Sequence, residues 1–170
     1  MPGRPLSASP SSEGGACHSY QKVGVHVNKD QFHFLIVDDF STMRRIVATL
    51  LKELDFSRIT EADNGITAMK ILTDNVTNIN FVLADWNMPA MDGLTMLRNI
   101  RATAHLRQIP VLMLTAEANK ENVIEAASAG ADGYIVKPFS AGTLSRQIEK
   151  IILRRYPHLV DAAPSTVQSA

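Results

Sequence analysis

Short apolar segments alternate with amphipathic helical segments five times along about 125 residues of this chain. The apolar segments do not alternate in polarity, which is typical of parallel strands that helices cover on both faces. Five strand–helix units are too few for a closed eight-stranded barrel, which needs about 250 residues. The alternation therefore predicts an α/β fold built on an open, doubly wound parallel sheet.

The expected bounds follow from the apolar runs and from their spacing. Strands are predicted at 33–38, 57–62, 79–84, 110–115 and 133–136. Helices are predicted at 41–54, around 68–72, around 94–100, at about 120–129 and at about 140–155. Ser41 is placed to cap the first of these helices, because a serine hydroxyl can accept a hydrogen bond from the first turn.

The two ends of the chain differ in composition from this central part. The N-terminal residues are rich in proline, serine and glycine, and such a segment buries too little apolar area to offset its ordering entropy. We therefore predict a disordered extension at 1–29, one folded domain at 30–156 and a flexible tail at 157–170. A purification tag or a mis-assigned translation start would also account for the extension.

Composition argues against several kinds of partner. Lysines plus arginines number 17 and aspartates plus glutamates number 17, so the formal net charge is zero, whereas a general nucleic-acid binder is normally basic. The chain has no run of about 18 apolar residues and no apolar signal-peptide core. The single Cys17 cannot form an internal disulfide. We expect a cytoplasmic protein that binds neither nucleic acid nor membrane.

Polar residues stand at the carboxyl ends of four predicted strands. Asp38 and Asp39 end the first, Asp85 follows the third, Thr115 ends the fourth and Lys137 follows the fifth. Open α/β sheets place their sites at this edge, so we expect these side chains to converge. Taken alone, the Asp38–Asp39 pair could instead be a capping pair at a strand end.

Such a convergence predicts a particular chemistry. Three neighbouring carboxylates repel one another by roughly 4 kcal/mol per pair at 4 Å in an effective dielectric near 20. A divalent cation removes this conflict, and an all-oxygen, partly hydrated site suits Mg²⁺. A carboxylate beside Mg²⁺, an ammonium group and a hydroxyl can act as a nucleophile toward phosphorus. The residues therefore predict phosphoryl transfer to Asp85.

Four sequence runs resemble chemotaxis response regulators of the CheY type and, more broadly, the receiver domains of two-component systems. They are LIVDDFSTMRRIV, LADWNMPAMDGL, PVLMLTAEA and GYIVKPF. The likeness spans about 30–155, and the runs DDFSTMRR and DWNMP narrow it to the chemotaxis branch. It implies a flavodoxin-like fold with five parallel strands in the order 2-1-3-4-5 and five helices.

The resemblance also assigns roles to the site residues. Asp85 would be the phosphoacceptor, and Lys137 would contact the phosphoryl group. Asp39, Asp85 and the backbone carbonyl of Asn87 would bind Mg²⁺ directly. Asp38 would act through a metal-bound water.

Further roles concern the switch and the lifetime of the phosphate. By resemblance, Thr115 would move toward the new phosphate and the ring of Tyr134 would turn inward. Asn87 and Glu117 would tune the rate at which water removes the phosphate. The Lys137–Pro138 peptide bond is expected to be cis.

No output domain follows the last predicted helix, so a signal would have to use the domain's own surface. The family's output face is its fourth helix, fifth strand and fifth helix. Its counterparts here are Ala118, Lys120, Val123, Tyr134 and Gln147. The implied partners are a histidine kinase, the flagellar motor switch protein and a phosphatase, acting on a monomer.

Two departures from the family keep an alternative open. The best-known members carry lysine in place of Gln147 and isoleucine in place of Val123, both on the output face. A phosphate sink, which drains a kinase without binding the motor, therefore remains an alternative.

A metal-dependent phosphatase with an aspartate nucleophile is disfavoured, because such enzymes of the haloacid dehalogenase type place a second Asp where Asn87 stands. We do not expect an enzyme.

Overall fold

The computed structural model describes residues 26–74, 76–116 and 119–161. Its centre is a five-stranded parallel sheet in the order β3-β2-β4-β5-β6, which confirms the predicted doubly wound topology. The strands are β2 (His33–Val37), β3 (Arg58–Ala62), β4 (Phe81–Asp85), β5 (Val111–Thr115) and β6 (Gly133–Val136).

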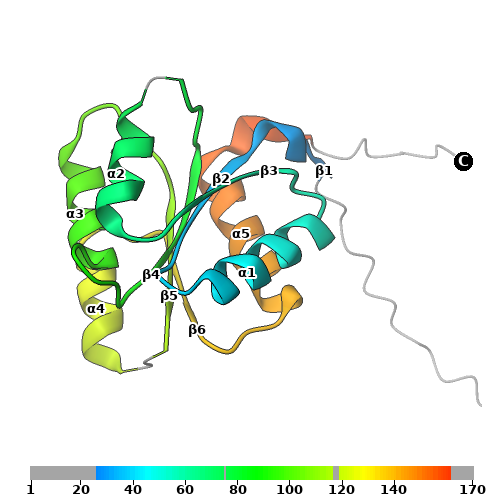
Figure 1. Ribbon diagram of the computed structural model, residues 1–170. Helices are drawn as coiled ribbons and strands as arrows, with labels where there is room; N and C mark the ends of the chain where they lie inside the picture. The colour runs from blue at the N-terminus through cyan, green and yellow to red at the C-terminus, as the bar shows by residue number, and fades with distance from the viewer. Residues whose placement is uncertain (1–25, 75, 117–118, 162–170) are drawn as a thin grey trace, which may run out of the picture.

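Five helices cover the sheet. They are α1 (Ser41–Glu53), α2 (Gly65–Thr73), α3 (Gly93–Ala102), α4 (Lys120–Ser128) and α5 (Ala141–Arg155). Figure 1 shows α2, α3 and α4 on one face and α1 and α5 on the other. Each face has its own hydrophobic core, and every residue of the central strand β4 is buried between the two. The continuous apolar runs thus mark strands covered on both faces.

The start of α1 differs from the prediction. Phe40, not Ser41, is the N-cap residue, and no side-chain hydrogen bond caps this helix. Asp38 Oδ1 instead accepts a hydrogen bond from the backbone N–H of Phe40 at 2.9 Å. The prediction that Ser41 caps the helix was wrong, because the carboxylate at the strand end already orders this turn.

Two short strands lie outside the predicted domain limits. β1 (His26–Val27) pairs antiparallel with β7 (Val160–Asp161), next to the short 3-10 helices η1 (Lys29–Gln31) and η2 (Pro157–Leu159). The described part of the chain therefore extends beyond 30–156 at both ends, and the domain limits stay a prediction. Residues 1–25 and 162–170 lie outside the described part, so their predicted disorder stays a prediction.

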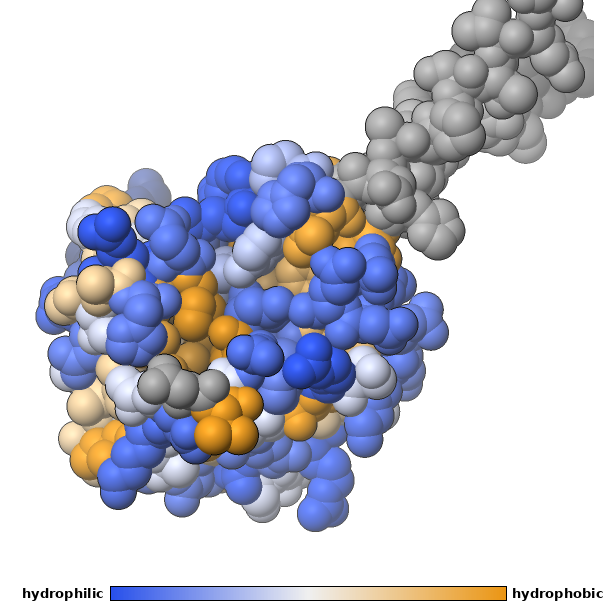
Figure 2. Space-filling model, turned by 90° about the horizontal axis from the view of Figure 1, so that it is seen from above, coloured by the Kyte–Doolittle hydropathy of each residue, from blue (hydrophilic) through white to orange (hydrophobic). Residues whose placement is uncertain are grey.

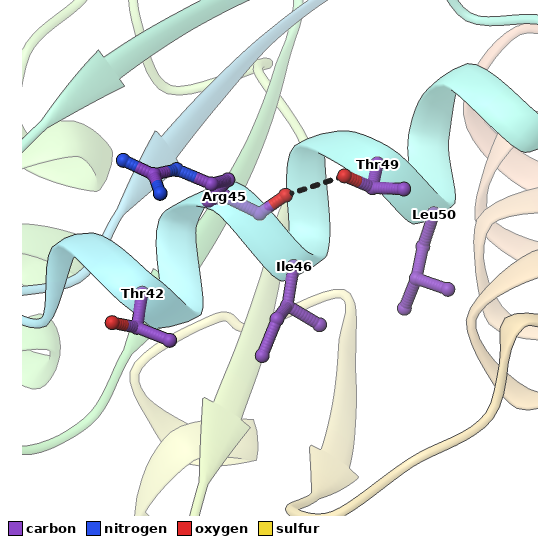
Figure 3. Close-up of a pocket in the computed structure, with 5 residues that line it drawn as sticks. All are labelled: Thr42, Arg45, Ile46, Thr49 and Leu50. Atoms are coloured by element: carbon purple, nitrogen blue, oxygen red, sulfur yellow. Dashed lines mark hydrogen bonds between the residues drawn. The ribbon is translucent and has the colours of Figure 1, made fainter.

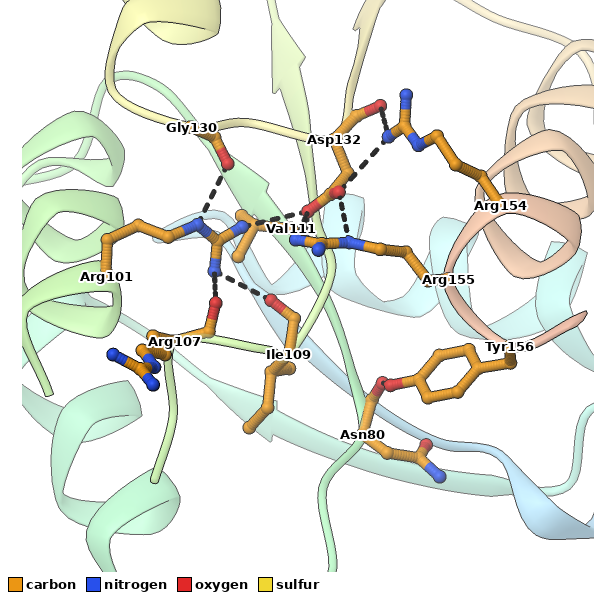
Figure 4. Close-up of polar contacts among 10 residues, drawn as sticks. All are labelled: Asn80, Arg101, Arg107, Ile109, Val111, Gly130, Asp132, Arg154, Arg155 and Tyr156. Carbon is orange, nitrogen blue, oxygen red and sulfur yellow. Dashed lines mark hydrogen bonds and ion pairs between the residues drawn. The ribbon is translucent and has the colours of Figure 1, made fainter. Parts of the chain in front are cut away.

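Asp132, just before β6, is a buried junction of charges (Figure 4). Its carboxylate accepts hydrogen bonds from Arg101 at 2.8 Å, Arg155 at 2.7 Å and Arg154 at 3.1 Å. It also accepts one from the backbone N–H of Val111 at 3.0 Å. One side chain thereby joins α3, β5, β6 and α5 at the amino-terminal ends of the strands.

Within the three described ranges, no helix is long and apolar enough to cross a bilayer. Figure 2 views the end of the molecule that is uppermost in Figure 1, where hydrophilic residues dominate and apolar residues form separate patches.

Candidate functional site

The carboxyl ends of the parallel strands bring the predicted polar residues together. Asp38 and Asp39 follow β2, while Asp85 and Thr115 end β4 and β5. Lys137 follows β6, and its peptide bond to Pro138 is cis, as predicted. Parallel pairing places all these ends at one edge of the sheet.

Lys137 connects two of the carboxylates. Its Nζ lies 2.7 Å from Asp38 Oδ2 and 2.8 Å from Asp85 Oδ1. The side chains of Asp38 and Asp85 are only 1% and 9% exposed, so the ammonium group offsets two charges that water reaches poorly. The same ammonium stands beside any group that becomes bonded to Asp85.

Burial and charge shift the titration of this pair. Burial raises the pKa of Asp85, and the nearby Asp38 charge adds to this effect, while Lys137 partly offsets it. Burial by itself would lower the pKa of Lys137, but its bonds to Asp38 and Asp85 outweigh burial and raise that pKa. The lysine therefore stays protonated between the two carboxylates.

The acidic cluster has the composition of a site for a hard cation. One carboxylate oxygen each from Asp38, Asp39 and Asp85 lie within 4.8 Å of one another. Among the described residues, Asp39 Oδ1 is buried and has no hydrogen-bond partner. Both oxygens of Asp38 are already engaged, by Lys137 and by the Phe40 amide. The residues present thus fit an oxygen-preferring divalent cation, with Asp39 the carboxylate most available to it.

A hollow of about 450 Å³ opens beside Asp85. Its lining comes from α1 and from three strand ends: Phe40, Thr42, Met43, Ile46, Asp85, Asn87, Ala116 and Lys137. An adjoining hollow of about 280 Å³ follows the same helix, and Figure 3 shows Ile46 and Leu50 pointing to one side while Arg45 points to another. The Asp85 carboxylate therefore lies at the end of an apolar strip on α1.

The predicted switch residues occupy neighbouring strands. Thr115 is fully buried at the end of β5, and Tyr134 on the edge strand β6 is half-buried against the core. Lys120 and Val123 are exposed on α4, and Gln147 is half-buried on α5. Helices α4 and α5 flank β6 from opposite faces of the sheet (Figure 1). The predicted output residues that are described thus lie along one side of the molecule.

Two predicted residues cannot be placed. Glu117 and Ala118 lie outside the described residues. Asn87 lines the hollow that also contains Asp85. Trp86, the only tryptophan, is half-buried next to Asp85 and packs against the core.

The sequence interpretation missed two residues that shape the site. Gly93 begins α3, and a Cβ there would overlap the backbone carbonyl oxygen of Asp85, so only glycine permits this approach. Arg44 is half-buried and bonds to the backbone of Asp38. Arg44 lies on the same face of α1 as the buried residues Val47, Ala48 and Leu51. This helical spacing could have predicted that Arg44 is partly buried.

Comparison with known proteins agrees with this geometry. The family model described as "response regulator receiver domain" matches residues 34–149, well over half of the chain. The chain belongs to this receiver domain family. Chemotaxis protein CheY-3 of Vibrio cholerae is 56% identical over 120 residues, which cover 71% of this chain and 91% of that protein. CheY of Pseudomonas aeruginosa is 53% identical, with 71% and 95% covered.

Solved receiver domains have the same fold. The structure of the chemotaxis response regulator CheY4 of Vibrio cholerae matches with a TM-score of 0.65 and 28% identity, over 71% of this chain and 98% of that one. A receiver domain protein from Clostridium thermocellum matches with a TM-score of 0.65 and 31% identity, over 73% and 96%. The predicted likeness to CheY-like response regulators is confirmed.

Proposed function

We propose that this receiver domain accepts a phosphoryl group on Asp85 from a histidine kinase, with Mg²⁺ bound at the acidic cluster. The phosphorylated domain then changes conformation and binds the flagellar motor switch. The observation that carries the proposal is Lys137 bridging Asp38 and Asp85 at 2.7 and 2.8 Å beside Asp39, whose Oδ1 has no partner in the described structure.

The transfer step balances without an added reactant. A carboxylate oxygen of Asp85 attacks the phosphorus of a phosphohistidine, a P–O bond forms and the P–N bond breaks. The electron pair of that bond stays with the imidazole nitrogen. Asp39, Asp85 and the backbone carbonyl of Asn87 would hold Mg²⁺ directly and Asp38 would do so through a water, and the ion would neutralise phosphoryl oxygens. Lys137 holds a proton on Nζ and would donate it in a hydrogen bond to a phosphoryl oxygen.

The surface beside Asp85 suits a protein donor. Phe40 and Ile46 are 68% and 48% exposed, and both line the hollow that contains Asp85. A small phosphodonor needs only the polar end of this hollow. An apolar strip along α1 adds the area that a kinase domain can cover.

The output is proposed from the family. Thr115 and Tyr134 would carry the change from Asp85 to the face formed by α4, β6 and α5, where Lys120, Val123 and Gln147 lie. Ala118, which the family likeness also assigns to the output, is outside the described residues. In this role the protein acts in the cytoplasm as a monomer, and a separate phosphatase is one of its partners. It turns over no external substrate, while Asn87 and Glu117 set its own dephosphorylation.

A phosphate sink is the second candidate. It is favoured by Gln147 and Val123, which replace the lysine and isoleucine of the best-known relatives on the output face. Binding of the phosphorylated protein to a motor-switch peptide distinguishes the two functions, because only the motor binder gains affinity on phosphorylation.

Trp86 fluorescence tests the shared first step. We expect one change in emission on adding Mg²⁺ and a second on adding acetyl phosphate, accompanied by the mass of one phosphoryl group. Asp85→Asn should lose the second change and the added mass. Wild-type protein that gains no phosphate would refute the proposed function.

A further inference from the structure

Arg44 reaches from α1 to two fixed oxygens beside the acidic cluster. Its Nη1 donates to the backbone carbonyl of Asp38 at 2.8 Å, and its Nε donates to Glu61 Oε2 at 2.9 Å. The Arg44 side chain is 17% exposed, and its bond to the Asp38 carbonyl is partly buried, whereas its bond to Glu61 is exposed. A planar guanidinium can satisfy two such acceptors at once with little loss of freedom.

These bonds hold the peptide that joins Asp38 to Asp39. The Asp38 amide donates to the carbonyl of Ala62 at 3.2 Å, and the Asp38 carboxylate accepts from the Phe40 amide. Arg44 holds the remaining backbone group, the carbonyl of the planar unit that leads into Asp39. Residues 38–40 are therefore held by a bond to β3, through Ala62, and by a bond to α1, through Arg44.

Asp39 depends on this backbone for its orientation. Its Oδ1 is buried and has no hydrogen-bond partner in the part of the chain that is described. No bond to that oxygen therefore directs the carboxylate, and the plane of the preceding peptide largely sets where it points. A change in that plane would move Asp39 relative to Asp38 and Asp85.

We infer that Arg44 is a positioning residue for Mg²⁺, because it holds the Asp38–Asp39 peptide so that the Asp39 carboxylate faces the other two. The inference rests on the proposed function, since it takes the acidic cluster as a Mg²⁺ site. Arg44 acts through the backbone and does not touch the ion.

The direction in which Mg²⁺ affinity changes when Arg44 is replaced shows whether Arg44 acts by positioning Asp39 or only through its charge. Arg44 is a cation close to a cation site, so removing its charge alone would tighten Mg²⁺ binding. Losing an outer contact that orients a metal ligand weakens binding, typically 10–100-fold. A general loss of stability lowers the melting temperature but leaves the affinity of the folded protein unchanged.

The experiment is an equilibrium Mg²⁺ titration followed by Trp86 fluorescence, without phosphodonor, on the full chain. We expect Arg44→Met to weaken Mg²⁺ binding about tenfold. Arg44→Lys should weaken it in the same direction but less, because one ammonium keeps the charge but lacks the guanidinium fork. Arg45→Met removes the same charge from the exposed neighbouring position and should bind Mg²⁺ like wild type or slightly more tightly.

Each outcome decides the inference. Equal or tighter Mg²⁺ binding by Arg44→Met, with wild-type binding intact, overturns it and leaves the proposed function standing. Wild-type protein that binds no Mg²⁺ overturns both. If Arg44→Met does not fold, as judged by circular dichroism, Arg44→Lys carries the test, and wild-type affinity in that variant overturns the inference.

Discussion

At the scale of one residue, Asp39 shows how a cluster of like charges lowers the stability of the folded protein. Without metal, its carboxylate lies beside Asp38 and Asp85 with one oxygen buried and unpartnered within the described structure. We expect Asp39→Asn to raise the free energy of unfolding in EDTA by about 1–2 kcal/mol, because it removes one repelling charge. Urea unfolding measures this, and the further stabilisation by Mg²⁺ should disappear in the variant.

A matched control separates this local effect from net charge. Asp30→Asn removes the same charge from an exposed position in η1 and should change stability by less than about 0.5 kcal/mol. An Asp39→Asn protein that is less stable than wild type in EDTA would contradict the account of a repelling acidic cluster.

At the scale of elements, the surface of α1 should matter for phosphoryl transfer from a kinase but not for transfer from a small phosphodonor. Ile46 is 48% exposed and lines both hollows on this helix. We expect Ile46→Glu to slow phosphoryl transfer from the cognate kinase at least about tenfold, because a charge in an apolar contact is costly to desolvate. The rate with acetyl phosphate, followed by Trp86 fluorescence, should stay within about twofold of wild type.

Val76→Glu is the control for this helix, since Val76 is 84% exposed and lies between α2 and β4, at the other end of the sheet. It should leave both rates unchanged. Equal slowing of kinase and acetyl phosphate by Ile46→Glu would instead mean that the substitution disturbs the site itself.

The same helix shows what the sequence could and could not predict. Its existence and its apolar face follow from residue spacing, and the convergence of Asp38, Asp85 and Lys137 follows from parallel strand order. The rotation of 100° per residue also separates Arg44, on the buried side of the helix, from the exposed Arg45. The two acceptors of Arg44, the Glu61 carboxylate and the Asp38 carbonyl, lie outside the helix, so that rotation alone could not identify them. The cap of α1 was mispredicted because the helix begins at Ser41 itself, after a turn in which the Phe40 amide donates to Asp38.

Long-range pairing limits prediction at the scale of the whole molecule. β1 and β7 have two residues each and lie at opposite ends of the chain, so neither has a local pattern that identifies it. Asp132 stands in a run, Gly-Ala-Asp-Gly, that indicates only a turn. Its three arginines come from α3 and α5, and only the folded arrangement brings them to one carboxylate (Figure 4).

The Asp132 junction should contribute to the stability of the whole domain without affecting the acidic cluster. The Asp132 carboxylate is 5% exposed, and its removal leaves Arg101, Arg154 and Arg155 close together without their shared anion. We expect Asp132→Asn to lower the free energy of unfolding by about 3 kcal/mol, the usual loss when one partner of a buried ion pair is removed. Asp55→Asn, which breaks a surface pair with Lys29 in which the Asp55 side chain is 85% exposed, should lower the free energy of unfolding by less than about 1 kcal/mol.

Two measurements on Asp132→Asn make the separation testable. Urea unfolding should shift to a lower midpoint with an unchanged slope, since the surface exposed on unfolding stays the same. The Mg²⁺ titration of the folded variant should match wild type, because Asp132 lies at the amino-terminal ends of the strands and the acidic cluster at their carboxyl ends. A weakened Mg²⁺ affinity would mean that the two ends of the sheet are coupled, and that the site's geometry depends on how α3 and α5 are held at their far ends.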